Sequence, residues 1–301
     1  MTIMPELRRM CRDIGLPDIP ITVGGIIPEE DHAPLRAAQI DGIYNPGTPT
    51  KTIIDSFREL AAKYRAGRGG AAAPDVRTPV GLARAITLLT QGHTEYLATL
   101  PPPVTPRVTI GITGAPGVGK STFIGKLAKV LRERQRKVAV IAVDPTSPIT
   151  GGSVLGDRLR IMGTEPDQGL FIRSLASEGQ AGGLAPHVAD IARVMAVAAY
   201  EIVLIETVGA GQNDVEVRKL TDEVLLLLMP GAGDAIQFAK AGVFEIATGY
   251  VVNKADLPGA DATVRQVREA LGAERPVWQV SCLRNEGLAP LAAWIEQRLA
   301  R

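Results

Sequence analysis

From Arg107 onward, apolar residues form short, nearly continuous runs, and the segments between these runs carry apolar residues at helical spacing. Such runs predict buried strands, and apolar residues three and four positions apart predict helices between them. The predicted strands are Val108–Thr113, Lys137–Val143, Leu170–Arg173, Ile202–Glu206, Val224–Met229, Tyr250–Val252 and Val277–Val280. The predicted helices are Lys120–Arg134, Ala185–Ala199, Asp234–Ile246, Ala262–Leu271 and Leu288–Leu299. This rhythm predicts an α/β domain with a mostly parallel sheet covered by helices on both faces.

The N-terminal third shows the same pattern on a smaller scale. The predicted short strands are Ile21–Val23 and Gly42–Tyr44, and the predicted helices are His32–Ala38, Thr52–Tyr64 and Gly81–Thr90. A stretch rich in glycine, alanine and proline separates the last two helices, which is typical of a linker. We therefore expect three parts: a small α/β fragment over 1–65, a linker with a helical lead-in over 66–105, and the main domain over 106–301.

Composition narrows the classes of function. The net charge is +1 and aromatic residues make up 4% of the chain, which argues against a nucleic-acid partner. No apolar run approaches the ~20 residues of a membrane-spanning helix, so no membrane partner is expected. The two cysteines, Cys11 and Cys282, stand far apart and outside any Cys/His cluster. They predict reduced thiols in a cytoplasmic protein, not a zinc site or a disulfide framework.

One glycine-rich segment follows a predicted strand and opens a predicted helix. It is Gly114-Ala115-Pro116-Gly117-Val118-Gly119-Lys120-Ser121, which matches G-x-x-x-x-G-K-[ST], and Thr122 follows it as a further candidate phosphate-binding residue. The glycines allow backbone N–H groups to surround a phosphate, and the helix that follows directs its positive dipole end at the same anion. Lys120 is suited to reach the β- and γ-phosphates, and the Ser121 hydroxyl is suited to ligate Mg²⁺. The strand and helix around it argue against a glycine-rich turn with an incidental lysine.

A second loop carries the pattern N-K-x-D after the strand that ends at Val252. The carboxylate of Asp256 is suited to accept hydrogen bonds from N1–H and the exocyclic amine of guanine. Adenine offers a lone pair at N1 and no amine at C2, so it would leave that carboxylate unpaired. Asn253 would brace the loop and contact the purine, and the Lys254 stem can lie along the base. The pattern alone also fits a helix-capping aspartate, but next to a phosphate loop it favours guanine recognition. Ser281-Cys282-Leu283, after the last strand, fits a loop that supports the base through main-chain N–H groups.

Several polar residues follow other predicted strands. Glu206 and Asp144 each end a strand, and Asp157 lies in a glycine-containing loop, so all three are candidate acids near a metal ion. Gly209 would let the backbone approach the γ-phosphate. The side chains Asp234, Gln237 and Lys240 are three residues apart and share one face of a predicted helix. Each of these residues also fits a helix cap or a solvated polar face.

The complete set of motifs resembles the MeaB/ArgK-type GTPases, which are G-protein chaperones of adenosylcobalamin-dependent acyl-CoA mutases. The similarity extends from about Val80 to about residue 290. It implies that GTP is the substrate, that Ser121, Asp144 and Glu206 hold or surround Mg²⁺, and that Lys120 and Glu206 support hydrolysis. It also places Asp157 in a first switch, Gln212 in a second, and Asp234, Gln237 and Lys240 in a third that senses the mutase. The implied function is to gate cofactor loading and to protect a methylmalonyl-CoA or isobutyryl-CoA type of mutase.

The N-terminal segment has a resemblance of its own. Val23-Gly24-Gly25-Ile26-Ile27-Pro28 with Asn45-Pro46-Gly47-Thr48 is similar to the C-terminal half of a cobalamin-binding domain. None of the histidines, His32, His93 and His187, stands in the D-x-H-x-x-G motif that ligates cobalt in that family. We therefore expect no cobalamin binding by this chain alone. The dimerisation extension of the GTPase family has no counterpart after Arg301, so a homodimer is left open.

Three rival interpretations remain at this point. A metallocentre-maturation GTPase of the same P-loop class would carry a His- or Cys-rich metal segment, and none is visible in the sequence. An ATP-using kinase or transport ATPase conflicts with the guanine-type loop at Asn253–Asp256. A non-catalytic scaffold would bind GTP only to present a surface. Nucleotide selectivity and turnover with and without a mutase separate these interpretations.

Overall fold

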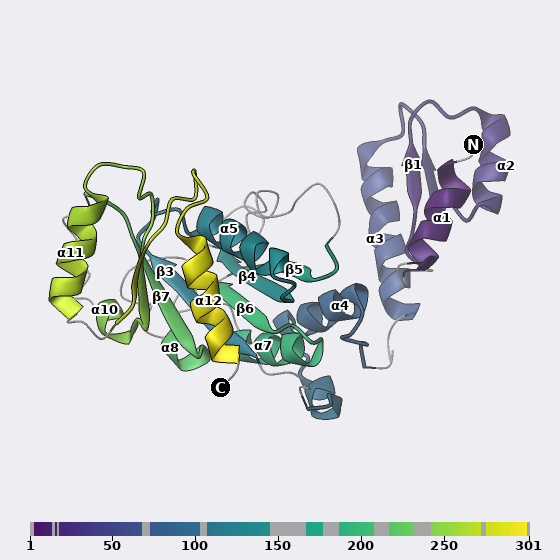
Figure 1. The fold of residues 1–301 in the computed structure, drawn as a ribbon. Helices are drawn as coiled ribbons and strands as arrows, with labels where there is room; N and C mark the ends of the chain where they lie inside the picture. Colours follow the sequence, from purple (N-terminus) through teal and green to yellow (C-terminus); the bar gives the residue numbers. More distant parts are fainter. Residues whose placement is uncertain are drawn as a thin grey trace. The chain divides into compact units, whose positions relative to one another are not determined.

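The computed structural model describes residues 3–13, 16, 18–67, 73–102, 107–144, 167–176, 187–207, 217–231, 242–271 and 275–299. The chain divides into two compact units, Met1–Pro74 and Asp75–Arg301, both drawn in Figure 1. Each unit has a hydrophobic core of its own.

The N-terminal unit is a small parallel α/β arrangement. Its elements are α1 Ile3–Asp13, β1 Thr22–Gly24, α2 Glu29–Ala37, β2 Gly42–Tyr44 and α3 Thr50–Gly67. Strands β1 and β2 pair in parallel with Val23 opposite Ile43. The helix α1 was not predicted from the sequence. It is held by Arg8, whose buried guanidinium donates to the carbonyl of Ile19 at 2.7 Å and to the Asp41 carboxylate at 3.2 Å.

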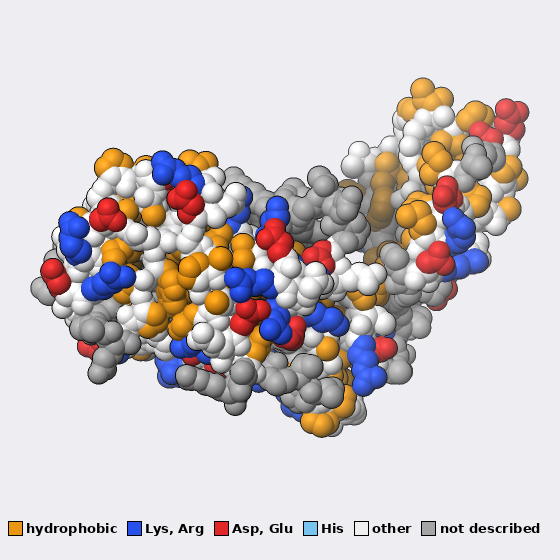
Figure 2. Space-filling model, in the orientation of Figure 1, with side chains coloured by type: hydrophobic (Ala, Val, Ile, Leu, Met, Phe, Trp, Pro, Cys, Tyr) orange, Lys and Arg blue, Asp and Glu red, His pale blue; other side chains and the backbone are white. Residues whose placement is uncertain are grey.

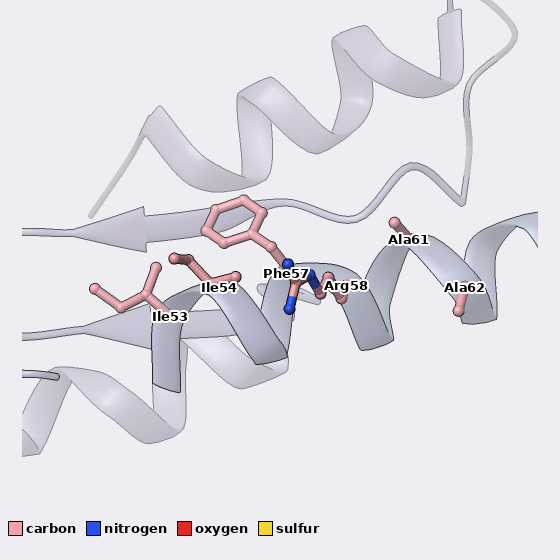
Figure 3. Close-up of a pocket in the computed structure, with 6 residues that line it drawn as sticks. All are labelled: Ile53, Ile54, Phe57, Arg58, Ala61 and Ala62. Atoms are coloured by element: carbon pink, nitrogen blue, oxygen red, sulfur yellow. The ribbon is translucent and has the colours of Figure 1, made fainter. Parts of the chain in front are cut away.

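The helix α3 keeps much of its apolar face at the surface. Phe57 stacks on Tyr44 with ring centroids 5.9 Å apart, and the Tyr44 hydroxyl donates to Ser56 at 2.7 Å. Even so, Phe57 and Ile54 are 48% and 44% exposed. Along this face runs a shallow hollow that is almost wholly apolar (Figure 3). Its lining residues are Ile53, Ile54, Phe57, Arg58, Ala61 and Ala62.

The second unit is built on a parallel sheet of seven strands among the described residues, in the order β5-β4-β6-β3-β7-β8-β9. The strands are β3 Val108–Gly114, β4 Val138–Asp144, β5 Leu170–Ala176, β6 Ile202–Glu206, β7 Glu223–Leu228, β8 Gly249–Val252 and β9 Val277–Gln279. The helices are α4 Pro79–Thr90, α5 Lys120–Glu133, α7 Val188–Val197, α8 Val217–Leu220, α10 Val243–Ile246, α11 Ala260–Leu271 and α12 Leu288–Leu299, with a 3₁₀ turn η1 at Glu95–Thr99. Since all strands are parallel, their carboxyl ends meet at one edge of the sheet.

Alternate residues of β4, β6 and β7 enter opposite cores, which explains the continuous apolar runs in their sequences. In β7, Leu225 and Leu227 face the core under α5 and α12, whereas Val224 and Leu226 face the core under α4 and α7. Figure 1 shows α5 and α12 side by side over the sheet. Because successive side chains of a strand point to opposite faces, a strand buried on both faces cannot alternate with polar residues. The predicted parallel α/β fold is therefore confirmed.

The helix α4 belongs to the core of the second unit. Its N-cap is Thr78, whose hydroxyl accepts from the backbone N–H of Gly81 at 3.0 Å, and Pro79 occupies the first helical position. Leu82, Ile86 and Leu89 are at most 1% exposed, and α4 packs against α7. The segment before the phosphate loop is thus part of the folded unit.

Some predicted boundaries differ from the structure. Of the predicted helix Asp234–Ile246, the structure describes only its end, as α10, because residues 232–241 lie outside the described part. The turn η1 and the short helix α8 were not predicted, since four or five residues give too little periodicity to detect. No helix within the described residues combines the length and the apolar character of a membrane span. On the face drawn in Figure 2, acidic and basic side chains of the second unit are interspersed.

Candidate nucleotide-binding site

The glycine-rich loop joins β3 to α5, as its sequence predicts. Gly117 and Gly119 have φ angles of +78° and +94°, which only glycine adopts without strain. Val118 lies between them with its side chain 1% exposed in the core, so that it anchors the loop. The loop thus places main-chain N–H groups at the N-terminus of a helix of 14 residues, where an anion is stabilised.

Lys120 and Ser121 open α5 on the inner side of this loop. The ammonium of Lys120 donates to the carbonyl of Gly114 at 2.8 Å, which holds its stem over the loop. The hydroxyl of Ser121 donates to Glu206 Oε1 at 2.8 Å. Glu206 reaches this position because β6 pairs with β3 and places Glu206 opposite Ile112, just before the loop. The structure therefore brings together Lys120, Ser121 and Glu206. Thr122, the next residue of α5, is exposed.

The pair Ser121 and Glu206 fits a hard divalent cation. Glu206 is 7% exposed, and a carboxylate this buried is favourable only next to donors or a cation. Among the described residues no group of three or more His, Cys, Asp or Glu gathers at any point. Mg²⁺ takes one or two carboxylates together with phosphate oxygens and water.

The loop after β8 lies against the phosphate loop. The Asn253 side chain donates to the carbonyl of Val118 at 2.9 Å, and the Lys254 ammonium donates to the carbonyl of Gly117 at 2.8 Å. Lys254 has a φ of +55°, a left-handed conformation that non-glycine residues seldom adopt. A Cβ on Gly119 would come within 2.9 Å of Asn253 Nδ2, so the loops can approach this closely only because Gly119 has no side chain.

Asp256 is held by the loop after β9. The hydroxyl of Ser281 donates to Asp256 Oδ1 at 2.5 Å, and the Ser281 oxygen accepts from the backbone N–H of Arg284 at 3.2 Å. The Ser281 hydrogen bond, followed by smaller effects that include the nearby charges of Arg284 and Lys254, lowers the pKa of the Asp256 carboxyl. The group is therefore an ionised acceptor at neutral pH, as recognition of guanine N1–H requires.

The other two residues of that loop have different environments. Cys282 is 8% exposed and its Sγ lies 3.3 Å from Asn253 Oδ1, whereas Leu283 is 80% exposed. Arg284 was missed in the sequence, because a basic residue in a turn is too common to stand out. Its contribution is visible only from the hydrogen bond and the charge that it brings to the Ser281–Asp256 pair.

Six predicted positions lie outside the described residues: Asp157, Gly209, Gln212, Asp234, Gln237 and Lys240. For Asp144 the structure describes the backbone, which ends β4 at the carboxyl edge of the sheet. The predictions for these seven residues stay predictions.

The fold and this loop arrangement define a P-loop nucleotide-binding protein. The sequence profile of one family, described as methylmalonyl-CoA mutase-associated GTPase MeaB, matches residues 82–300. The chain belongs to this MeaB family, and the predicted resemblance to MeaB/ArgK-type GTPases is confirmed. The match leaves residues 1–81 outside, so the likeness of the N-terminal segment to a cobalamin-binding domain stays a prediction.

Individual relatives agree with this assignment. GTPase ArgK of Escherichia coli is 39% identical over 212 residues, which cover 68% of this chain and 60% of ArgK. The mitochondrial methylmalonic aciduria type A homolog of Caenorhabditis elegans is 40% identical over 183 residues, which cover 58% of this chain and 46% of that protein. The crystal structure of a protein described as LAO/AO transport system kinase superposes with a TM-score of 0.59 at 27% identity, covering 75% of this chain and 72% of that one. The chain thus spans about half to three fifths of the length of these two curated relatives.

Proposed function

We propose that this chain binds GTP with Mg²⁺ and hydrolyses its γ-phosphate. The observation that carries the proposal is the direct junction of two loops: Asn253 and Lys254 donate to the carbonyls of the phosphate loop. A base reader fixed to a phosphate loop sets the distance between base and triphosphate. The ionised Asp256 on the same loop then selects a purine that offers two donors, which guanine does and adenine does not.

We assign the phosphates to the backbone of the loop Gly114-Ala115-Pro116-Gly117-Val118-Gly119 and to the first residues of α5. Lys120 would neutralise the β- and γ-phosphates, and Thr122 would offer its backbone N–H. Ser281, Cys282 and Leu283 would support the base from the side of Asp256. The support for this assignment is that the loop at residues 253–256 contacts both the loop at 114–122 and the loop at 281–283 at one edge of the sheet.

We assign the metal ion to Ser121 and Glu206, with Asp144 and Asp157 as further acids near it. The support is the hydroxyl–carboxylate pair at 2.8 Å. The chemistry that a bound Mg²⁺ supplies is neutralisation of negative charge on the phosphate oxygens. Lys120 and the N–H groups of the phosphate loop would stabilise the remaining charge as a water molecule attacks in line. Gly209, Gln212, Asp234, Gln237 and Lys240 are assigned to switch segments that approach the γ-phosphate and assist this step.

We further propose that the partner is an adenosylcobalamin-dependent acyl-CoA mutase. The family to which the chain belongs is described as associated with methylmalonyl-CoA mutase. In this proposal GTP binding and hydrolysis gate the loading of the cofactor into the mutase and protect it from inactivation. The chain itself binds no cobalamin in this proposal, so cobalamin added to the chain alone should keep its absorption spectrum.

The test is a hydrolysis assay with the full chain alone and with mutases of the methylmalonyl-CoA and isobutyryl-CoA types, with GTP and ATP in parallel. We expect GTP-selective turnover that rises with one mutase. Lys120→Ala should abolish it, because the charge on the γ-phosphate loses its counter-ion. Lys129→Ala, an exposed lysine on the same helix, is the matched control and should turn over normally. GTP turnover that no mutase changes would refute the proposed partner and leave the GTPase standing.

A second candidate is an ATP-using enzyme, favoured by the similarity to a protein described as a transport system kinase. In that case the same assay would give ATP turnover at least equal to GTP turnover. The carboxylate of Asp256 argues against it, since it would face the N1 lone pair of adenine.

A further inference from the structure

Cys282 takes part in the contact between the base loop and the phosphate loop. Its thiol lies 3.3 Å from Oδ1 of Asn253, and the Nδ2 group of the same amide donates to the carbonyl of Val118 at 2.9 Å. Cys282 and Asn253 are 8% and 2% exposed, so that water has little access to either group. One amide therefore connects the loop after β9 with the phosphate loop.

The two neighbours of the amide fix its orientation. The carbonyl of Val118 can only accept, so it requires the N–H₂ side of Asn253. The amide oxygen then faces Cys282, and a protonated thiol is the donor that pairs with it. Burial raises the pKa of Cys282 to about 11, so the thiol keeps this proton throughout the neutral range.

We propose that Cys282 is a positioning residue for nucleotide binding: its thiol holds the Asn253 amide in the orientation that joins the base loop to the phosphate loop. The inference rests on the proposed binding of GTP, and extends it to a residue whose side chain acts through Asn253. Without the thiol donor, the amide oxygen has no partner at that position, and Asn253 is free to turn away from Val118 before nucleotide binds.

In a variant without the thiol, the Asn253 side chain has to be ordered when the nucleotide binds, and this ordering costs free energy. We expect a 3- to 10-fold change in the dissociation constant, which corresponds to about 0.7–1.4 kcal/mol and lies within the cost of ordering one side chain on binding. The loss should be the same for GTP and ITP, because Asp256 and its contact with Ser281 remain in place. ITP lacks only the exocyclic amine, which Asn253 does not read.

The experiment measures dissociation constants of GTP and ITP by calorimetry in the presence of Mg²⁺. The proteins are the full chain, Cys282→Ala, Cys282→Ser, the bulkier donor-free Cys282→Val, and the matched control Cys11→Ala in the N-terminal unit. We expect 3- to 10-fold weaker binding of both nucleotides by Cys282→Ala and Cys282→Val. Cys282→Ser, which keeps a donor, and Cys11→Ala should stay within about twofold of the wild type.

Each outcome has a distinct meaning. Unchanged affinity in Cys282→Ala or Cys282→Val would overturn the inference while leaving GTP binding intact. A Cys282→Ser variant as weak as Cys282→Ala would overturn it as well, because the hydroxyl supplies the same donor. If Cys282→Ala does not fold, the comparison of Cys282→Val with Cys282→Ser decides. A wild-type chain that binds no GTP would refute the proposed function, and the inference with it.

Discussion

Gly114, the first residue of the phosphate loop, offers a direct test of how the sheet constrains that loop. It has a φ of +148°, and a Cβ at this position would come within 2.5 Å of the carbonyl oxygen of Leu227. That carbonyl cannot move away easily, because Leu227 is paired with Gly114 in the ladder between β3 and β7. Gly114→Ala should therefore destabilise the second unit, both through the backbone conformation and through the steric contact.

Gly117→Ala provides the matched comparison. Gly117 also has a positive φ, +78°, but nothing lies within 4 Å of a Cβ built on it. An alanine there should cost only the left-handed backbone conformation, about 1 kcal/mol. Gly114→Ala adds overpacking against backbone, typically 1–3 kcal/mol, so we expect about 3 kcal/mol in total.

Thermal unfolding followed by tryptophan fluorescence measures the difference. Both tryptophans, Trp278 and Trp294, lie in the second unit with ring centroids 5.0 Å apart, so the signal reports on that unit. For a unit of this size 1 kcal/mol shifts Tm by about 2–4 °C. We expect losses of about 6–12 °C for Gly114→Ala and about 2–4 °C for Gly117→Ala. Equal shifts in the two variants would refute the role given to the Leu227 carbonyl.

Three further predictions concern the site. Ser121→Ala and Glu206→Gln should each lower GTP turnover at least tenfold at 1 mM Mg²⁺, because each removes one oxygen ligand of the metal ion. A higher Mg²⁺ concentration should restore part of the turnover. Turnover independent of Mg²⁺ in both variants would contradict the assignment. Because the pKa of Asp256 is held below its ordinary value, the ratio of GTP affinity to ITP affinity should stay constant as the pH falls from 7 to about 5, since the phosphates of both nucleotides titrate alike. Asp256→Ala should abolish the preference for GTP over ITP, and a ratio that already falls between pH 7 and 6 would argue against a carboxylate acceptor. Because the pKa of Cys282 is about 11, only about one Cys282 thiol in a thousand is ionised at pH 8. Iodoacetamide should therefore modify the half-buried Cys11 at least tenfold faster than Cys282. Equal rates of modification would show that Cys282 is not shielded.

Local patterns in the sequence determined the class of fold and predicted most of the residues that we assign to the candidate site. Continuous apolar runs at β4, β6 and β7 predict strands buried on both faces, because no polar alternation is present there. The phosphate loop could be predicted because its glycines, lysine and serine lie within one short segment of the sequence. The chemistry proposed for them could be predicted for the same reason. The pattern at Asn253–Asp256 gained its meaning from its place after a strand in the same chain.

Weak local patterns limited what could be predicted from the sequence. In the helix α1, Ile3, Leu7 and Met10 are exposed while Met4 and Cys11 pack against the core, so the apolar residues do not mark one buried face in the sequence. Its place depends on Arg8, whose partners Ile19 and Asp41 come from distant parts of the unit.

The tertiary structure alone decided which residues meet. Asn253 reaches Val118 across 135 positions, and Ser121 reaches Glu206 across 85, because the strand order places β6 and β7 beside β3 and β8 beside β7. Strand order depends on non-local packing, which a sequence pattern does not encode. The same holds for Cys282: the sequence shows an isolated thiol, and only the packing of the loop after β9 against Asn253 gives that thiol a partner.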